Sequence, residues 1–190
     1  MAAEYPEFRL GSVLATSFTA TLTERQGQRL ERIPVPQRLA DWFDVSGLAV
    51  ESCSADNLAV AVELRESIHT AFTAAASRSA PPASAVEVIN DRSIRGNASA
   101  VLTSELTRRW VLDSAARVED AFGVIAADAI TILAGDRDGR LALCASPTCR
   151  AAFFDTSQSR TRRWCDMNTC GNRQKKARLK SARAQGKSAR

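Results

Sequence analysis

The sequence lacks most of the features that mark enzymes, secreted proteins and membrane proteins. It has a single histidine, His69, and contains no G-x-S-x-G, P-loop or dinucleotide-binding glycine motif. No apolar run reaches the roughly 18 residues of a membrane span, and acidic residues stand where a secretory leader carries basic ones. We therefore expect a cytoplasmic, non-enzymatic protein without a membrane partner. His69 is expected to be a structural or surface residue rather than a switch or ligand.

The charge of the chain is unevenly distributed. Residues 1–136 hold 12 basic and 18 acidic residues, a net of −6, whereas residues 137–190 hold 14 and 3, a net of +11. With 190 residues, 45% of them apolar and 25% charged, the chain can form one main globular domain and a small appendage. We expect a domain at 1–136 and a basic module at 137–190, whose commonest partner would be nucleic acid.

Apolar periodicity predicts a mainly helical first domain. Ala55 to Arg78 follows the pattern of one buried helix face, with Ser54 as N-cap. Three further helices are expected: Gln37 to Val45, Ala83 to Ile94 before Gly96, and one from a cap at Asp113 or Ser114 to Gly135. Ala98 to Leu112 favours a strand or hairpin, and Phe8 to Leu22 allows either strand or helix.

Four of the five cysteines are clustered in the basic module. Cys144-x4-Cys149 and Cys165-x4-Cys170 form two symmetric pairs separated by 15 residues. Short loops let each pair present two sulfurs from one turn, which is how tetrahedral four-cysteine zinc sites are built. With all four positions filled by protein, the one zinc ion would be structural rather than catalytic. The spacer suits a hairpin or an extended connection, and Cys53 is most simply a small buried residue.

Other interpretations of the cluster are disulfides, an iron–sulfur site or unlinked buried thiols. A reducing cytoplasm disfavours disulfides, and the spacing differs from the ferredoxin patterns. The only aromatic residues of the module are Phe153, Phe154 and Trp164, which we expect to form a small core around the metal rather than to stack on bases.

The residues after Cys170 predict a basic helix. Between Gly171 and Ala184 they are good helix formers without proline, and Arg173, Lys176, Lys180 and Arg183 fall within an arc of about 80°. Such a face can contact the phosphates or the major groove of DNA. The alternative is a solvated tail, and the residues from Gly186 onward are expected to fray. Further candidate nucleic-acid contacts are Arg160, Arg162, Arg163 and Asn172.

At these residues the sequence resembles the bacterial CGNR zinc-finger family. The resemblance rests on Cys144-Ala-Ser-Pro-Thr-Cys149, Phe154-Asp-Thr-Ser157, Arg162-Arg-Trp-Cys165 and Cys170-Gly-Asn-Arg173, and covers about residues 141–184. It departs from the family pattern at Gln158 and Asp166, where we would expect Arg and Ser. Members are regarded as stress-induced transcription regulators with a helical N-terminal domain, so the resemblance implies DNA binding by the finger.

These observations combine into one expected architecture and function. We expect an α+β, mainly α fold, in which a helical N-terminal domain with a small strand pair precedes a treble-clef-like zinc module of hairpin and basic helix. The expected function is regulation of transcription in response to stress by binding duplex DNA. We also expect a homodimer and a small-molecule effector of the N-terminal domain. The rival functions are RNA binding, a protein-interaction module and, less favoured, an enzyme.

Overall fold

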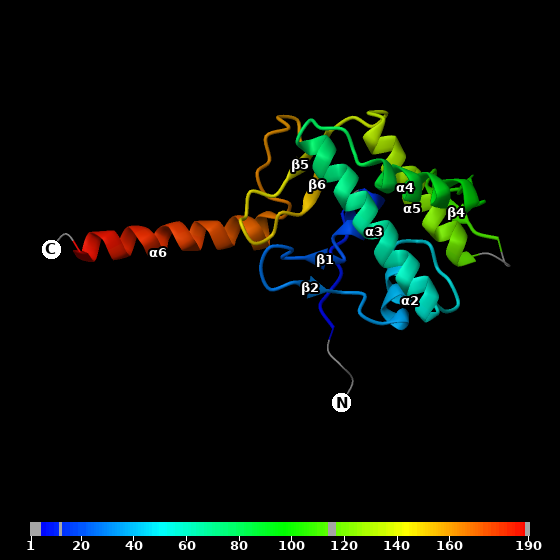
Figure 1. Ribbon diagram of the computed structural model, residues 1–190, viewed down its shortest axis with the longest axis horizontal. Coiled ribbons are helices and arrows are strands. Elements are labelled where there is room, and N and C mark those ends of the chain that lie inside the picture. Colours follow the sequence, from blue (N-terminus) through cyan, green and yellow to red (C-terminus); the bar gives the residue numbers. More distant parts are fainter. Residues whose placement is uncertain (1–4, 12, 114–116, 189–190) are drawn as a thin grey trace.

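The computed structural model describes residues 5–11, 13–113 and 117–188, and within 182–188 only the backbone. Two short helices, a central long helix and two further helices form the body, and a zinc module follows (Figure 1). The body comprises α1 Leu14–Thr19, β1 Leu22–Thr23, β2 Leu30–Glu31, α2 Pro36–Val45, α3 Ala55–Ala76, α4 Ala83–Arg95, β3 Ser99–Leu102, β4 Arg108–Val111 and α5 Arg117–Leu133. The module comprises β5 Arg140–Leu143, β6 Ala152–Asp155, the π-helical turn η1 Met167–Gly171 and α6 Asn172–Ser188.

The long helix α3 begins where its capping residues predict. The Ser54 side chain accepts a hydrogen bond from the backbone N–H of Asn57, whose side chain accepts one from the backbone N–H of Ser54. This reciprocal pair satisfies two donors that a helix N-terminus otherwise leaves free. The predicted helices at 37–45, 55–78 and 83–94 are confirmed within two residues at their ends.

Helices α4 and α5 cross at two glycines. A Cβ atom at Gly96 would lie 2.5 Å from the Cα of Gly123, and a Cβ at Gly123 would lie 2.5 Å from the Cα of Gly96. Only glycine permits this approach, so Gly96 has a packing role in addition to the predicted one of ending α4. Close by, the buried carboxylate of Asp120 accepts hydrogen bonds from the backbone N–H groups of Asn97 and Asp113. The alternative predicted cap, Ser114, lies outside the described residues.

The core of the body is aromatic at its centre. Phe18, Trp42, Phe43 and Phe122 are fully buried, and neighbouring ring centroids are 5.0 to 5.9 Å apart. These tilted and edge-on contacts are the geometry that aromatic pairs prefer. Phe18 lies on α1, within the segment that sequence periodicity left unassigned, so this segment supplies part of the core.

The first strands are held on α3 by the ion pairs of two arginines whose side chains are buried. Arg65, with 2% of its side chain exposed, pairs with Glu31 of β2 at 2.8 Å and with Glu66 at 2.9 Å. Arg25, which follows β1, pairs with Glu66 at 2.6 Å. The β1–β2 hairpin was not predicted, because its two-residue strands are too short to show alternation. Removing a partially exposed acidic partner would leave a buried guanidinium uncompensated, so the network fixes the hairpin on α3.

The module begins on the body and ends away from it. The antiparallel β5–β6 hairpin packs against α3, whereas α6 extends into solvent on the side opposite to the β3–β4 hairpin (Figure 1). Within the described residues, η1 is the only element that α6 packs against extensively. The predicted class, α+β and mainly α with a strand pair at 98–112, is confirmed. The boundary between residues 136 and 137 stays a prediction.

None of the described helices combines the length and the apolar character needed to cross a membrane.

Candidate metal centre and basic helix

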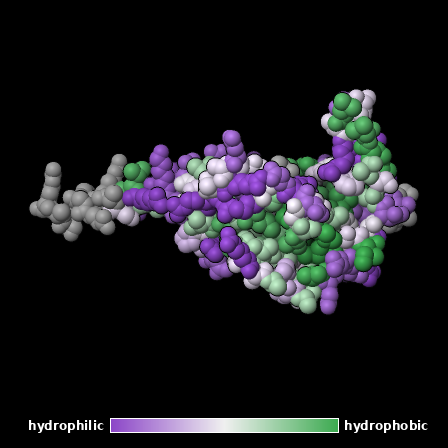
Figure 2. All heavy atoms as spheres, turned by 90° about the horizontal axis from the view of Figure 1, so that it is seen from above, coloured by the Kyte–Doolittle hydropathy of each residue, from purple (hydrophilic) through white to green (hydrophobic). Residues whose placement is uncertain are grey.

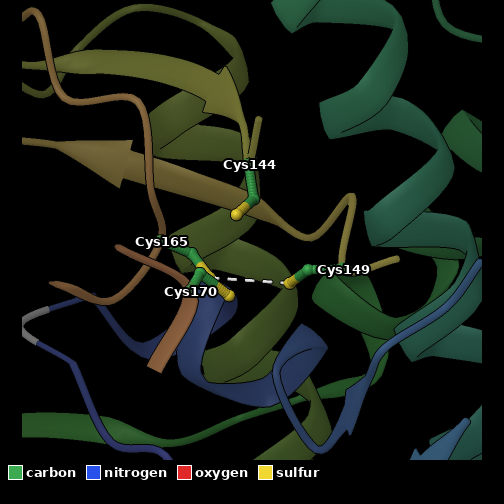
Figure 3. A group of neighbouring side chains, drawn as sticks. All are labelled: Cys144, Cys149, Cys165 and Cys170. Atoms are coloured by element: carbon green, nitrogen blue, oxygen red, sulfur yellow. Dashed lines mark hydrogen bonds between the residues drawn. The ribbon is translucent and has the colours of Figure 1, made fainter. Parts of the chain in front are cut away.

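The four predicted cysteine ligands converge on one point (Figure 3). Their sulfur atoms all lie within 4.8 Å of one another, with 3.6 Å between Cys149 and Cys165 and 3.7 Å between Cys165 and Cys170. Four thiolates at about 2.3 Å from one tetrahedral zinc ion are about 3.8 Å apart. A disulfide would require about 2.05 Å. The spacing therefore fits a single shared metal ion and no pairwise bond.

Two different local structures present the two pairs. Cys144 directly follows β5, and Cys149 lies just before β6, so the first pair occupies the connecting loop of the hairpin. Within that loop the N–H of Cys149 donates to the carbonyl of Ser146 at 3.2 Å, and Arg150 has a positive φ of 49°. Cys165 ends the extended spacer, and Cys170 lies in η1. Only the strand β6 of the hairpin comes from the spacer between the cysteine pairs.

The thiols cannot all ionise side by side unless a cation compensates them. Hydrogen bonds from Cys149 and Cys165 lower the pKa of Cys144, while hydrogen bonding to Cys144 and Cys149 raises the pKa of Cys165. Burial raises the pKa of Cys170 to about 12. Without a metal the cluster therefore retains protons, and it releases them when a divalent ion binds to the sulfur atoms. Cys144, Cys149 and Cys170 are fully buried. The residues present fit one structural zinc ion with four protein ligands and no position for water.

The spacer between the pairs is organised by Asp155. Its buried carboxylate accepts hydrogen bonds from the backbone and hydroxyl of Ser157 and from the backbone N–H of Arg162. Although burial opposes it, these bonds hold the pKa of Asp155 below its usual value. The backbone carbonyl of Arg163 accepts from Ala145 at 2.8 Å, which ties the spacer to the first cysteine loop.

The predicted aromatic core around the metal is only partly correct. Trp164 packs against the cysteines, but Phe154 belongs to the main core of the body. Phe153 is buried and covered by the guanidinium of Arg162, 5.5 Å from its ring centre. Because neighbouring side chains of a strand point to opposite faces, β6 inserts Phe154 into the body and presents Phe153 to the other side. The hairpin is thus anchored by the body and not only by zinc.

The tetrapeptide Cys170-Gly171-Asn172-Arg173 marks the start of α6. A Cβ at Gly171 would lie 3.0 Å from the Sδ of Met167 and 3.3 Å from Trp164, so this position has little space for a side chain. Asn172 donates to the carbonyl of Asn168 at 3.2 Å. Before it, Asp166 accepts hydrogen bonds from the N–H of Asn168 and the hydroxyl of Thr169 and caps η1. Asp166, where the family pattern led us to expect Ser, therefore has a structural role as the N-cap of η1.

Arg173 connects the zinc module with the body. Its Nη1 donates to the Oε2 of Glu24 at 2.5 Å, and the same oxygen accepts from the hydroxyl of Thr148 at 2.7 Å. Beside this contact, the N–H groups of Arg25 and Gln26 donate to the carbonyls of Cys149 and Thr148. Sequence reasoning missed Glu24, because 149 residues separate it from Arg173 and no local pattern links them.

The predicted nucleic-acid contacts fall into two groups. Lys176 and Lys180 are exposed on the projecting part of α6, and Arg183 continues that helix, although its side chain lies outside the described part. The others are exposed but already engaged within the chain: Arg160 with Asp138, Arg162 with the carbonyl of Cys165, Arg163 over the Trp164 ring, Arg173 with Glu24, and Asn172 with Asn168. Contact of any of them with nucleic acid stays a prediction.

Comparison with known families gives two matches that together cover most of the chain. Residues 12–136 match the family model ABATE, described as "Putative stress-induced transcription regulator", and residues 140–183 match the model described as "CGNR zinc finger". The second match contains all four cysteines of the cluster and agrees with the resemblance seen in the sequence. None of the curated proteins matches the chain significantly.

Proposed function

This chain belongs to the ABATE family and carries a CGNR zinc finger, and we propose that it regulates transcription by binding duplex DNA through α6. The observation that carries the proposal is the position of this helix. Zinc and the contact with Glu24 hold its first turn, while the rest extends beyond the body (Figure 1). Its 17 residues span about 25 Å at a rise of about 1.5 Å per residue.

The projecting helix carries charge of only one sign. It holds seven basic residues and no acidic one, and hydrophilic surface extends along the part whose side chains are described, residues 172–181 (Figure 2). Like charges three or four residues apart, such as Lys176 and Lys180, destabilise an isolated helix by about 0.2–0.5 kcal/mol per pair. Beyond the first turn no packing against the described part of the body offsets this repulsion. A polyanion would offset it, so the helix is better suited to a partner than to solvent.

Duplex DNA fits this helix in shape as well as in charge. An α-helix with side chains is about 10–12 Å wide, which matches the major groove at about 12 Å. Lysines of the exposed face can meet phosphates as point charges, and arginine can pair with guanine. Because the guanidinium of Arg173 pairs with Glu24, we assign the DNA contacts first to Lys176 and Lys180 and then to Arg183.

The test is a salt series of binding to duplex DNA, single-stranded RNA and double-stranded RNA of equal length. Each phosphate contact adds about 0.9 to the slope of log affinity against log salt. Lys176→Ala/Lys180→Ala should weaken DNA binding at low salt and reduce the slope by about 1.8. The matched control is Lys175→Ala/Arg178→Ala, which removes the same charge from the other side of α6. Absence of duplex binding, or equal losses in both variants, contradicts docking by this face.

The proposal extends to the location of the protein, its lack of enzymatic activity and its preference among nucleic acids. We propose a cytoplasmic, non-enzymatic protein that responds to stress and recognises duplex DNA in preference to RNA or another protein. A regulator is the class to which the ABATE match points, and the two RNA probes of the salt series test the main rival. Homodimer formation stays a prediction, and measurement of the mass in solution with and without DNA would test it.

A further inference from the structure

A cavity of about 390 Å³ lies between the body and the zinc module. The body contributes residues 9–11, Val13, part of α1, Ala20 and Thr23 to its wall. The module contributes residues 151–154, Arg162 and residues 165–168. The volume is within the range of about 300–1,000 Å³ that small-molecule sites occupy. Any molecule held here would touch both parts of the chain at once.

The body wall carries positive charge that forms no ion pair with a carboxylate of the described residues. The Nη1 of Arg9 is buried and has no hydrogen-bond partner among the described residues. Behind the wall, Arg32 is 2% exposed and donates only to carbonyls and to the hydroxyl of Thr23. Burial, and after it the charge of Arg9, lower the pKa of Arg32 to about 10. The charges of Glu31 and Glu24 offset part of this repulsion at Arg32, whereas Arg9 lines the cavity without an ion pair and favours an anion there.

The module wall adds a third cation and one acid. Arg162 uses its Nη2 to donate to the carbonyl of Cys165, and its guanidinium covers Phe153. The acid, Asp166, has both carboxylate oxygens engaged as the cap of η1, with Asn168 and Thr169. No ion pair between Asp166 and Arg9 is formed, although the charge of Arg9 contributes, after these hydrogen bonds, to lowering the pKa of Asp166. The remaining walls are largely apolar, with Leu10, Val13, Phe153, Phe154 and Met167 among them.

We propose that this cavity binds a small organic carboxylate with an apolar body, in which the carboxylate pairs with Arg9 and the apolar part lies against Phe153 and its neighbours. Hydrogen bonds to an ionised group are about twice as strong as neutral ones, so the carboxylate supplies selectivity. The apolar part supplies affinity by burial. Binding does not depend on the proposed DNA function.

The consequence of binding for regulation does rest on that function. The module wall includes the zinc ligand Cys165 and the turn η1, from which α6 begins. A ligand that joins this wall to the body would change the freedom of α6 relative to the body. A change in DNA affinity follows only if the ligand distinguishes between the orientations of the module.

The experiment is calorimetric titration of the full zinc-loaded chain with benzoate and with benzamide, its neutral counterpart of the same shape. We expect benzoate to bind at least tenfold more tightly than benzamide, and Arg9→Gln to remove that preference. Arg109→Gln, which removes an exposed charge from β4 at the far end of the body, should preserve it. Equal binding of the two compounds, binding of neither, or a preference that survives in Arg9→Gln overturns the proposal.

Two further measurements keep this test informative. Arg9→Gln is misfolded if it contains less than one zinc per chain or has an altered circular dichroism spectrum. In that case the comparison of benzoate with benzamide in the unaltered chain alone decides whether the proposal holds. DNA affinity is then measured with and without benzoate. Because binding of benzoate is recorded without DNA, a failure of the carboxylate site is distinguishable from a failure of the DNA proposal.

Discussion

The contact between Glu24 and the zinc module gives the most specific prediction. Glu24→Gln keeps the size of the side chain but removes the charge that meets Thr148 and Arg173. Hydrogen bonds to charged groups contribute about 1.5–3 kcal/mol and neutral ones about 1 kcal/mol. Arg173 has 44% of its side chain exposed, which limits its share to about 0.2–1 kcal/mol. We therefore expect Glu24→Gln to lower the free energy of unfolding by about 1–2 kcal/mol.

Thermal unfolding followed by circular dichroism measures this effect. For a chain of this size, each kcal/mol shifts the melting temperature by about 2–4 °C, so a fall of about 2–8 °C is expected. Glu87→Gln, at an exposed position of α4, is the control and should change it little. The double variant with Arg173→Gln should cost less than the sum of the single variants. If Glu24→Gln behaves like Glu87→Gln, the contact does not hold the module, and our reasoning about it is wrong.

Three further outcomes are expected. Cys165→Ser should lose its bound zinc by elemental analysis while Cys53→Ser keeps one ion per chain, and retention of zinc by Cys165→Ser would contradict the assigned ligands. Gly123→Ala should lower the free energy of unfolding, measured by urea denaturation, by about 1–3 kcal/mol, because the added Cβ would clash with the backbone of Gly96. An unchanged free energy would show that a Cβ can be accommodated where α4 and α5 cross. Burial lowers the pKa of His69 to about 4, so the unfolded chain binds a proton that the folded chain does not, and up to about 2–3 kcal/mol should be lost as the pH falls from 6.5 toward 4. His69→Asn should show a smaller loss over this pH range, and an equal loss would assign the effect to other groups.

Features that depend on neighbouring residues were predictable from the sequence. Ser54 marks the start of α3 because a capping interaction spans three residues, and the paired cysteines indicate zinc because each loop defines its own turn. The start of α6 at Asn172 follows in the same way from the good helix formers after Cys170. These signals are local, so no knowledge of the tertiary structure is needed to recognise them.

Features that depend on distant residues were not predictable. Nothing near Glu24 indicates that it meets Arg173, and an exposed-looking arginine in a basic helix is expected to face a partner rather than the body. Phe154 was assigned to the metal because it is close to the cysteines in sequence, but the pleat of β6 directs it into the core of the body. The cavity at Arg9 requires two segments about 150 residues apart, and the charge pattern of either one alone does not reveal it.

The lysine content of the chain permits the most direct test of the central claim, that zinc holds a basic helix for duplex DNA. All four lysines, Lys175, Lys176, Lys180 and Lys187, lie in α6, so an amine-specific reagent reports on this helix. Limited acetylation followed by mass spectrometry should show that DNA protects Lys176 and Lys180 several-fold and Lys175, on the other side, less. Chelation of zinc should remove the difference. Equal acetylation of all these lysines with and without saturating DNA would contradict the account.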